Sequence, residues 1–462
     1  MKFTRIFLCA IAIGISLQVT AQRYKQAPPQ KTRVLLLLDA SGSMLGKLDN
    51  SQLKISVARD ILSDLIDSLK VDKSVELALR VYGHQYDRKR QVCTDSKLEV
   101  PFRPANHDQI IQKLRGLQPK GTTPIAYSLE QTATDFPASS DYRNVVIIIT
   151  DGIESCDGDP CEVSLALRSK NIYLKPFVIG LGVDVQYSEN FTCLGRYFNA
   201  TDVPAFRNTL NDILVQTLEE TTVSVELLDH QNNKTVSDLN ISFSDAETGT
   251  DVYDFVHYRD QTGRPDSVTI DAIRTYDLTV FSVPPAKLKN VNITGGQHNV
   301  IPVKVPQTSL SFSMKGYSEY GRKIPVIIRE AGSREILNNQ DFRQSYQYLT
   351  GTYDLEIFTF PKTVLSNVKL EAAQPKKIVL SQPGVVNFEL GAKGFASLYE
   401  VKNGLSTWVY NFPYETTQWT TAMQPGEYKL VYRADYAKGS KFTEILRFTV
   451  ASGSTQTINV NR

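Results

Sequence analysis

Residues 33–219 alternate short apolar runs with helical patterns, and this alternation constrains the fold more than any other feature of the chain. The apolar runs occupy residues 34–38, 75–81, 145–149 and 172–179. The first run lacks polar alternation, which is typical of parallel strands that are covered on both faces. Between the first two runs, apolar residues recur every three or four positions over residues 53–69, which predicts an amphipathic helix. The order predicts an α/β domain with a doubly wound, mostly parallel sheet.

Further helices are predicted in the same part of the chain, over residues 108–114, 124–134, 160–169 and 204–218. Three of them begin with a proline, which suits the first position of a helix because its missing N–H would have no partner there. Together with the apolar runs they complete a β-α-β pattern.

After residue 220 the pattern changes to short alternating strands broken by Gly, Asn and Pro, which predicts β-sandwiches. Similar phrases begin at Tyr276, Tyr353 and Tyr428, so the spacings are 77 and 75 residues. This repeat predicts three tandem all-β modules of immunoglobulin or transthyretin-like size, over residues 220–305, 306–385 and 386–462.

The first 21 residues have a basic start, an apolar centre and a small-residue end, which predicts a secretory signal peptide cut before Gln22. No later segment is long and apolar enough to predict a membrane span. Without Lys2 and Arg5 the chain has 49 basic and 49 acidic residues, a balance that does not favour nucleic-acid binding. We therefore expect an exported protein, located in the periplasm, on the cell surface or in the medium.

Oxygen-bearing side chains follow two of the predicted strands and precede one predicted helix. Residues 39–43 have the sequence Asp-Ala-Ser-Gly-Ser, Thr122 and Thr123 precede Pro124, and Asp151 follows the most apolar run. Each motif alone is an ordinary turn or helix cap. Because the carboxyl ends of parallel strands meet at one edge of a sheet, we expect these oxygens to converge, and hard divalent cations prefer oxygen ligands.

The three motifs in this order resemble the metal-ion-dependent adhesion site of von Willebrand factor A domains, and the resemblance covers residues 33–219. It implies a Rossmann-like fold and a Mg²⁺ site, with Mn²⁺ or Ca²⁺ as alternatives. The residues that match the ligand positions are Asp39, Ser41, Ser43, Thr123 and Asp151. It also implies an open coordination position that an Asp or Glu of a protein ligand fills, and movement of the last helix, over residues 204–218, when ligation changes.

Four cysteines remain after the signal peptide, and an even number in an exported chain favours two disulfides. We expect Cys156 to pair with Cys161 across a short loop and Cys93 with Cys193, although four cysteines allow three pairings. A zinc site is disfavoured because the C-x-x-C spacing is absent. His84 follows a strand near the same edge, and we expect it to be a hydrogen-bonded structural histidine.

The function expected from these features is metal-dependent binding or adhesion, without enzymatic activity. A first alternative is an envelope scaffold in which the metal only stabilises the fold. A second is a hydrolase that uses the metal or a serine, but Gly-x-Ser-x-Gly is absent around Ser43, and histidines are few in this domain.

Overall fold

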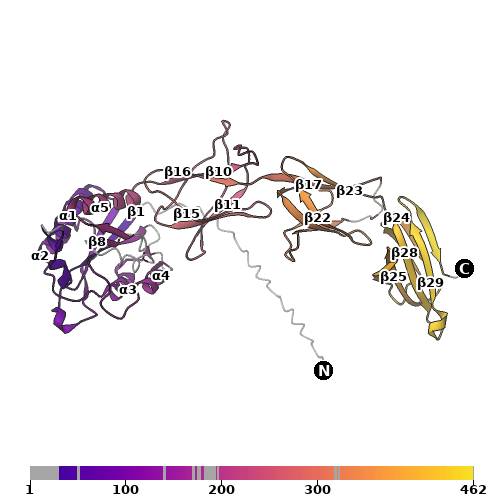
Figure 1. Ribbon diagram of the computed structural model, residues 1–462, viewed down its shortest axis with the longest axis horizontal. Helices are drawn as coiled ribbons and strands as arrows, with labels where there is room; N and C mark the ends of the chain where they lie inside the picture. The colour runs from indigo at the N-terminus through magenta and orange to yellow at the C-terminus, as the bar shows by residue number, and fades with distance from the viewer. Residues whose placement is uncertain are drawn as a thin grey trace, which may run out of the picture.

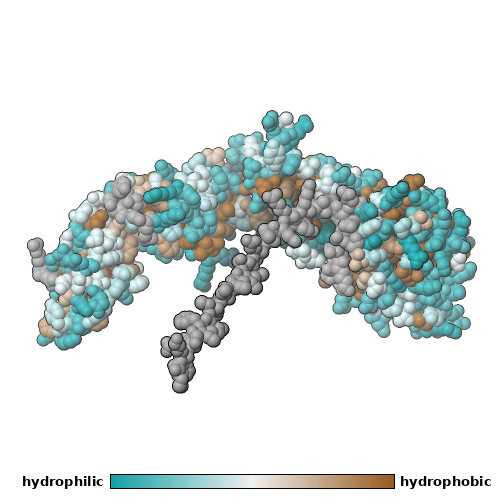
Figure 2. Space-filling model, turned by 180° about the vertical axis from the view of Figure 1, so that it is seen from behind, coloured by the Kyte–Doolittle hydropathy of each residue, from teal (hydrophilic) through white to brown (hydrophobic). Residues whose placement is uncertain are grey.

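The computed structural model is an arch, with an α/β domain at one end followed by three β modules in a row (Figure 1). It describes residues 31–48, 52–138, 142–168, 172–173, 178–181, 194, 197–316, 320 and 323–460. The expected signal peptide lies outside these residues. Within them, no helix has the length and apolar character that crossing a membrane requires. The face drawn in Figure 2 is mainly hydrophilic, since most apolar side chains are enclosed in the domains.

One sheet of seven strands forms the centre of the α/β domain in the described residues. The strands are β1 Lys31–Asp39, β4 Val75–Tyr82, β5 Ser96–Val100, β6 Tyr142–Thr150, β7 Ile172–Tyr173, β8 Val178–Leu181 and β9 Tyr197–Ala200. The order is β5-β4-β1-β6-β8-β9, with β7 also paired to β6. Only β5 is antiparallel to its neighbour. The expected doubly wound, mostly parallel sheet is confirmed.

Helices cover both faces of this sheet, and all five predicted helices are present. They are α1 Lys54–Ser68, α2 His107–Gly116, α3 Ile125–Asp135, α4 Pro160–Arg168 and α5 Val203–Leu218. Alternate residues of β1 point to opposite faces: Leu36 and Leu38 pack in the cluster that contains α1, α2 and α5, whereas Leu35 and Leu37 pack with α3 and α4. Short elements complete the domain: η1 Gly42–Leu45, η2 Leu69–Val71, η3 Arg88–Arg90 and the hairpin of β2 Lys47–Leu48 with β3 Gln52–Leu53.

The middle of this sheet positions the candidate site. The chain leaves β1 toward β4 on one side and later returns to form β6 on the other side of β1. In open α/β sheets, ligands bind beyond the carboxyl ends of the strands where the strand order reverses in this way. Asp39 is the last residue of β1 and Asp151 directly follows β6.

Each β module pairs a three-stranded sheet with a four-stranded sheet. The first contains β10 Thr222–Leu228, β11 Asn240–Asp245, β12 Asp251–Val256, β13 Val268–Thr269, β14 Thr275–Val280, β15 Ala286–Asn292 and β16 His298–Lys304. The second contains β17 Gln307–Met314, β18 Pro325–Glu330, β19 Asn338–Asp341, β20 Tyr346–Leu349, β21 Gly351–Ile357, β22 Thr363–Leu370 and β23 Lys376–Leu380. The third contains β24 Gly384–Glu389, β25 Gly394–Lys402, β26 Leu405–Asn411, β27 Gln418–Met423, β28 Gly426–Ala434, β29 Glu444–Val450 and β30 Thr455–Asn459.

The tyrosine that begins each repeated phrase is a buried anchor of its module. Tyr276, Tyr353 and Tyr428 are at most 2% exposed. Their hydroxyls donate to backbone carbonyls four or five residues upstream, at 2.7 Å in each case. A buried tyrosine needs such a partner for its hydroxyl. The repeat seen in the sequence is therefore a repeated packing device.

Neighbouring modules are joined by a backbone hydrogen bond between equivalent positions at both junctions. The Leu349 N–H donates to the Val283 carbonyl at 2.7 Å, and the Gln424 N–H donates to the Phe360 carbonyl at 2.7 Å. Each accepting carbonyl lies in the loop after the tyrosine strand, directly before a cis proline. Each donating N–H lies four residues before the next module's tyrosine.

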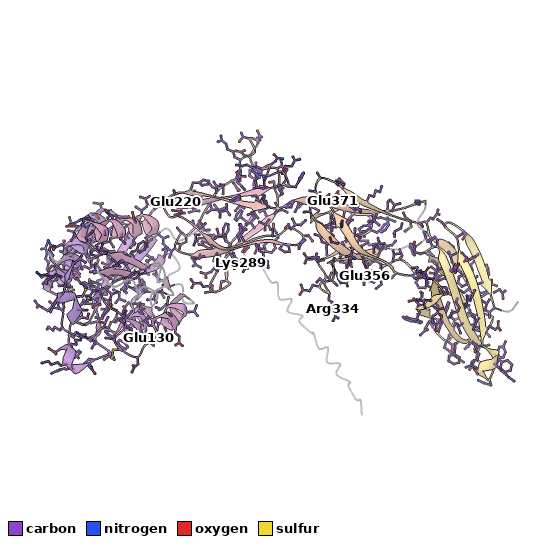
Figure 3. The ribbon with its side chains drawn as sticks, viewed as in Figure 1. Glu130, Glu220, Lys289, Arg334, Glu356 and Glu371 are labelled. Atoms are coloured by element: carbon purple, nitrogen blue, oxygen red, sulfur yellow. A yellow bond between two sulfur atoms is a disulfide. The ribbon has the colours of Figure 1, made fainter. Side chains whose placement is uncertain are left out.

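The α/β domain joins the first module through buried charges and apolar contact. Arg143 on β6 forms an ion pair with Asp271, with 3.1 Å between nitrogen and oxygen. Asp271 also accepts a hydrogen bond from the N–H of Ile273, whose side chain packs in the core cluster that contains α5. Figure 3 labels Glu220 at this junction. The first β module is therefore attached directly to the core of the α/β domain.

Candidate metal centre

The loop that follows β1 brings the side-chain oxygen atoms of Asp39, Ser41 and Ser43 close together. Asp39 is fully buried, and its carboxylate accepts hydrogen bonds from the Ser41 N–H and the Thr150 hydroxyl, at 2.7 Å each. The hydroxyl oxygens of Ser41 and Ser43 are 2.9 Å apart. An isolated bridge between Ser41 and Gly121 joins this loop to the loop that precedes α3. The first three candidate residues therefore form one connected group.

The end of β6 adds the second carboxylate. One oxygen of Asp151 accepts a hydrogen bond from the Ser43 hydroxyl at 2.7 Å. The other oxygen lies 3.0 Å from the ammonium of Lys54, the first residue of α1. The Asp151 side chain is only 1% exposed. The first and third candidate motifs are thus in direct contact.

Thr123 approaches from the loop before α3. A Cβ atom built on Gly152 would lie 3.9 Å from both the Thr123 hydroxyl and the Ser43 hydroxyl, so both hydroxyl oxygens lie near the residue that follows Asp151. The hydroxyl of the neighbouring Thr122 donates instead to the Val92 carbonyl at 3.0 Å. Of the two threonines, Thr123 is the one whose hydroxyl lies near the residue that follows Asp151.

Two carboxylates, Asp39 and Asp151, share one ammonium at this centre, so a bound cation would reduce the remaining negative charge. Burial, and after it the nearby Asp151 carboxylate, raise the pKa of Asp39 to about 6, against hydrogen bonds with Ser41 and Thr150 that lower it. Two buried carboxylates and three hydroxyls suit a hard divalent cation, which prefers oxygen ligands. The residues present therefore fit Mg²⁺.

Sequence reasoning missed three residues that support the centre. Thr150 is fully buried and holds Asp39 through its hydroxyl. Glu154 accepts hydrogen bonds from the Ala126 N–H at 2.6 Å and the Cys156 N–H at 2.8 Å, so it fixes the start of α3. Lys54 provides an ammonium that nothing in the motif predicts. The sequence signal for Thr150 was present, since it stands between the apolar run and Asp151, but a threonine there is also an ordinary strand residue.

Both expected pairings, Cys156 with Cys161 and Cys93 with Cys193, are wrong, because Cys156 is bonded to Cys93. Cys161 is also disulfide-bonded, and its partner lies outside the described residues, as does Cys193. Packing explains the pairing. The loop before α3 lies between two segments: the Thr122 hydroxyl bonds to Val92, and the Thr123 N–H donates to the Ser155 hydroxyl at 2.7 Å. Cys93 and Cys156, the next residues, meet beside this loop.

His84 is a structural histidine, as expected. Its Nε2 lies 3.0 Å from a carboxylate oxygen of Glu99, and Lys97 and Lys113 also pair with Glu99, at 2.9 Å each. Burial raises the pKa of Glu99, but the hydrogen bonds from Lys113, Lys97 and His84 outweigh it and lower that pKa to about 2. His84 therefore shares the buried Glu99 carboxylate with two half-exposed lysines.

This network makes stability depend on pH. The depressed pKa of Glu99 contributes stability fully above the ordinary value of 4.5, and the contribution is lost as the pH falls from 4.5 toward 2. We expect Glu99→Gln to lower the urea midpoint at pH 7, and the difference from wild type to shrink between pH 4.5 and pH 3. The control is Glu130→Gln, an exposed residue on α3 (Figure 3). A constant difference at all pH values would contradict the assignment.

Comparison with known proteins identifies the α/β domain. The family model of the von Willebrand factor type A domain matches residues 34–214. The protein YwmD of Bacillus subtilis (strain 168) is 30% identical over 210 residues, which make up 43% of this chain and 92% of YwmD. The chain belongs to the von Willebrand factor type A (VWA) domain family. YwmC of the same organism is 26% identical over 211 residues, which make up 44% of this chain and 91% of YwmC.

Among the solved structures compared with this chain, one matches it over nearly its whole length. The pilus adhesin SpaC from Lactobacillus rhamnosus GG is 10% identical, with a TM-score of 0.34, over 94% of this chain and 87% of SpaC. Manganese-loaded TRAP from Plasmodium vivax is 20% identical, with a TM-score of 0.31, over 40% of this chain and 74% of TRAP. At these low scores the likenesses carry no weight for the function of the VWA chain.

Proposed function

We propose that this chain is an exported binding protein whose VWA domain holds Mg²⁺ and presents it to an Asp or Glu of a protein ligand. The metal ligands are Asp39, Ser41, Ser43, Thr123 and Asp151, and Mn²⁺ or Ca²⁺ are alternative occupants. The observation that carries the proposal is the chain of hydrogen bonds that links Asp39, Ser41, Ser43 and Asp151 at the point where the strand order of the sheet reverses, and the Thr123 hydroxyl near Gly152 supports it.

The choice of residue types supports binding rather than catalysis. When bound, a divalent cation with only two carboxylates and several neutral hydroxyls stays electrophilic and accepts a further carboxylate. The residues of this chain would hold and orient that cation: Thr150 fixes Asp39, and Ser43 links the two carboxylate loops. His84 pairs with Glu99 through Nε2, and none of its printed contacts is with a candidate metal residue.

The three β modules fit a binding protein whose VWA domain is carried away from its point of attachment. They continue the chain from α5 to residue 460 in one direction, so the VWA domain lies at one end of the arch (Figure 1). An envelope scaffold with a stabilising metal site is the alternative function. The expected signal peptide places either protein outside the cytoplasm.

Metal binding is the first test. The EDTA-treated full chain should bind Mn²⁺ or Mg²⁺ at one site in isothermal titration calorimetry, and Asp39→Ala should weaken binding at least about 100-fold because it removes a buried anionic ligand. The matched control is Asp64→Ala, an exposed aspartate on α1 that pairs only with Arg207 in the described residues. Equal Mn²⁺ affinity of Asp39→Ala and wild type would refute the site.

The acidic ligand is the second test. Arrays of peptides that contain Asp or Glu, and matched arrays with Asn or Gln, should be probed with the full chain in Mg²⁺ and in EDTA. The proposal expects binding that needs both the acidic side chain and the metal. Metal binding that raises the melting temperature but gives no acid-dependent, Mg²⁺-dependent peptide binding would favour the scaffold.

A further inference from the structure

The Lys54 ammonium occupies a position at the candidate metal centre. Lys54 begins α1, and its side chain is 14% exposed. The ammonium lies 3.0 Å from Asp151 Oδ2, and the Asp151 side chain is almost fully buried. Among the described contacts of Asp39 and Asp151, this is the one cation. A buried ion pair of this kind differs from the exposed pairs elsewhere on the surface, which contribute little.

The two partners of Asp151 are not equivalent toward a metal. The Ser43 hydroxyl has one proton and two lone pairs, so it can keep its hydrogen bond to Asp151 Oδ1 while a lone pair faces a cation. An ammonium has three donors and no acceptor, and it repels a second cation. A divalent cation that binds Asp151 must therefore oppose or displace Lys54, whereas Ser43 can stay.

The side chain can leave without disturbing the fold. The backbone N–H of Lys54 donates to the Gly46 carbonyl at 2.9 Å. The start of α1 is therefore fixed, through main-chain atoms, to the segment that follows the candidate ligands at residues 39–43. The ammonium sits at the end of a flexible four-carbon stem. Exchange of ammonium for metal therefore needs a rotamer change and no movement of the helix.

We propose that Lys54 is the resident counter-ion of the metal-free centre and competes with the divalent cation for Asp151, so that it sets the metal affinity of the VWA domain. This inference rests on the metal site proposed above. Lys54 neutralises Asp151 when metal is scarce, and only a cation concentration high enough to displace it switches the centre to its binding form. Lys54 is a positioning residue in this scheme and does not touch the protein ligand.

A structural ion pair predicts a different outcome, and melting temperatures separate the two roles. If Lys54 only stabilises the fold, Lys54→Met should lower the melting temperature equally in EDTA and in saturating Mg²⁺. If it competes with metal, the variant should be less stable than wild type in EDTA, because the buried Asp151 carboxylate loses its counter-ion, and should gain more stability than wild type when Mg²⁺ is added.

The deciding experiment is calorimetric titration of the EDTA-treated full chain with Mn²⁺. We expect Lys54→Met, which keeps an apolar stem, to bind at least about tenfold more tightly than wild type. Lys54→Arg keeps the charge and should stay within about threefold of wild type. Lys70→Met, which removes an exposed lysine paired with Asp67 and Asp108, is the matched surface control. If Lys54→Met does not fold in EDTA, Lys54→Gln replaces it.

The outcomes separate the two proposals. No Mn²⁺ binding by wild type or by any Lys54 variant refutes the metal site itself. Mn²⁺ binding by wild type together with equal or weaker binding by Lys54→Met leaves the metal site standing and overturns the competition. Tighter binding by Lys54→Met with unchanged Lys54→Arg and Lys70→Met supports it.

Discussion

Gly83→Ala is expected to cost the VWA domain more than about 3 kcal/mol of stability and to abolish Mn²⁺ binding. Gly83 has a φ of +71°, a left-handed conformation that favours glycine. A Cβ atom there would lie 2.5 Å from the Thr122 carbonyl oxygen and 2.9 Å from each of two Ser41 backbone atoms, N and Cα. All three contacts are with main chain, so no rotamer change can relieve them, and both candidate metal loops must shift. Urea unfolding and Mn²⁺ titration measure the two effects.

The matched control for Gly83 is Gly116→Ala at the end of α2. A Cβ atom on Gly116 would meet nothing within 4 Å, and this glycine has no positive φ. Alanine lowers the conformational freedom of the unfolded chain, so the variant should be as stable as wild type or more stable by up to about 1 kcal/mol. Wild-type stability of Gly83→Ala would show that the loops are more adaptable than their packing indicates.

Loss of the disulfide between Cys93 and Cys156 has the second large expected effect. The bond closes a loop with a sequence separation of 63 residues, and removal of a native disulfide costs about 2–5 kcal/mol. It also connects the segment that contains Ser155, whose hydroxyl accepts a hydrogen bond from the Thr123 N–H, to the segment that contains Val92. These two segments lie on opposite sides of the loop before α3. We therefore expect the Cys93→Ser, Cys156→Ser double variant to unfold at lower urea and to bind Mn²⁺ more weakly than wild type.

The single variants test whether the bond itself is responsible. Cys93→Ser and Cys156→Ser each remove the same bond, so each should lose nearly as much stability as the double variant. Losses that simply add, with the double variant twice as destabilised as either single variant, would indicate that packing of the two side chains matters more than the bond.

The sequence predicted the α/β sheet and its helices because both depend on periodicity along the chain. The run from Val34 to Leu38 has no polar residue, and it forms a strand packed on both faces. The helix that begins near Leu53 was equally clear, because its apolar positions repeat at helical spacing. The candidate metal residues came from motifs at strand ends, and the topology brings those ends together.

Contacts between distant loops could not be predicted in the same way. Cys156 and Cys161 are close in sequence, but the partner of Cys156 is decided by a loop that passes between Val92 and Ser155. Lys54 looked like an ordinary residue at a helix start, and only the fold places its ammonium beside Asp151. In both cases the deciding contact joins segments with no shared local pattern.

The repeated junction of the β modules has a consequence for how such a chain changes in evolution. Each junction uses one N–H before a tyrosine strand and one carbonyl before a cis proline, at 2.7 Å both times. The middle module therefore carries the donor at one end and the acceptor at the other. A duplicated copy of it would present the same backbone donor and acceptor to its neighbours, so these two bonds allow the row of modules to lengthen in whole-module steps.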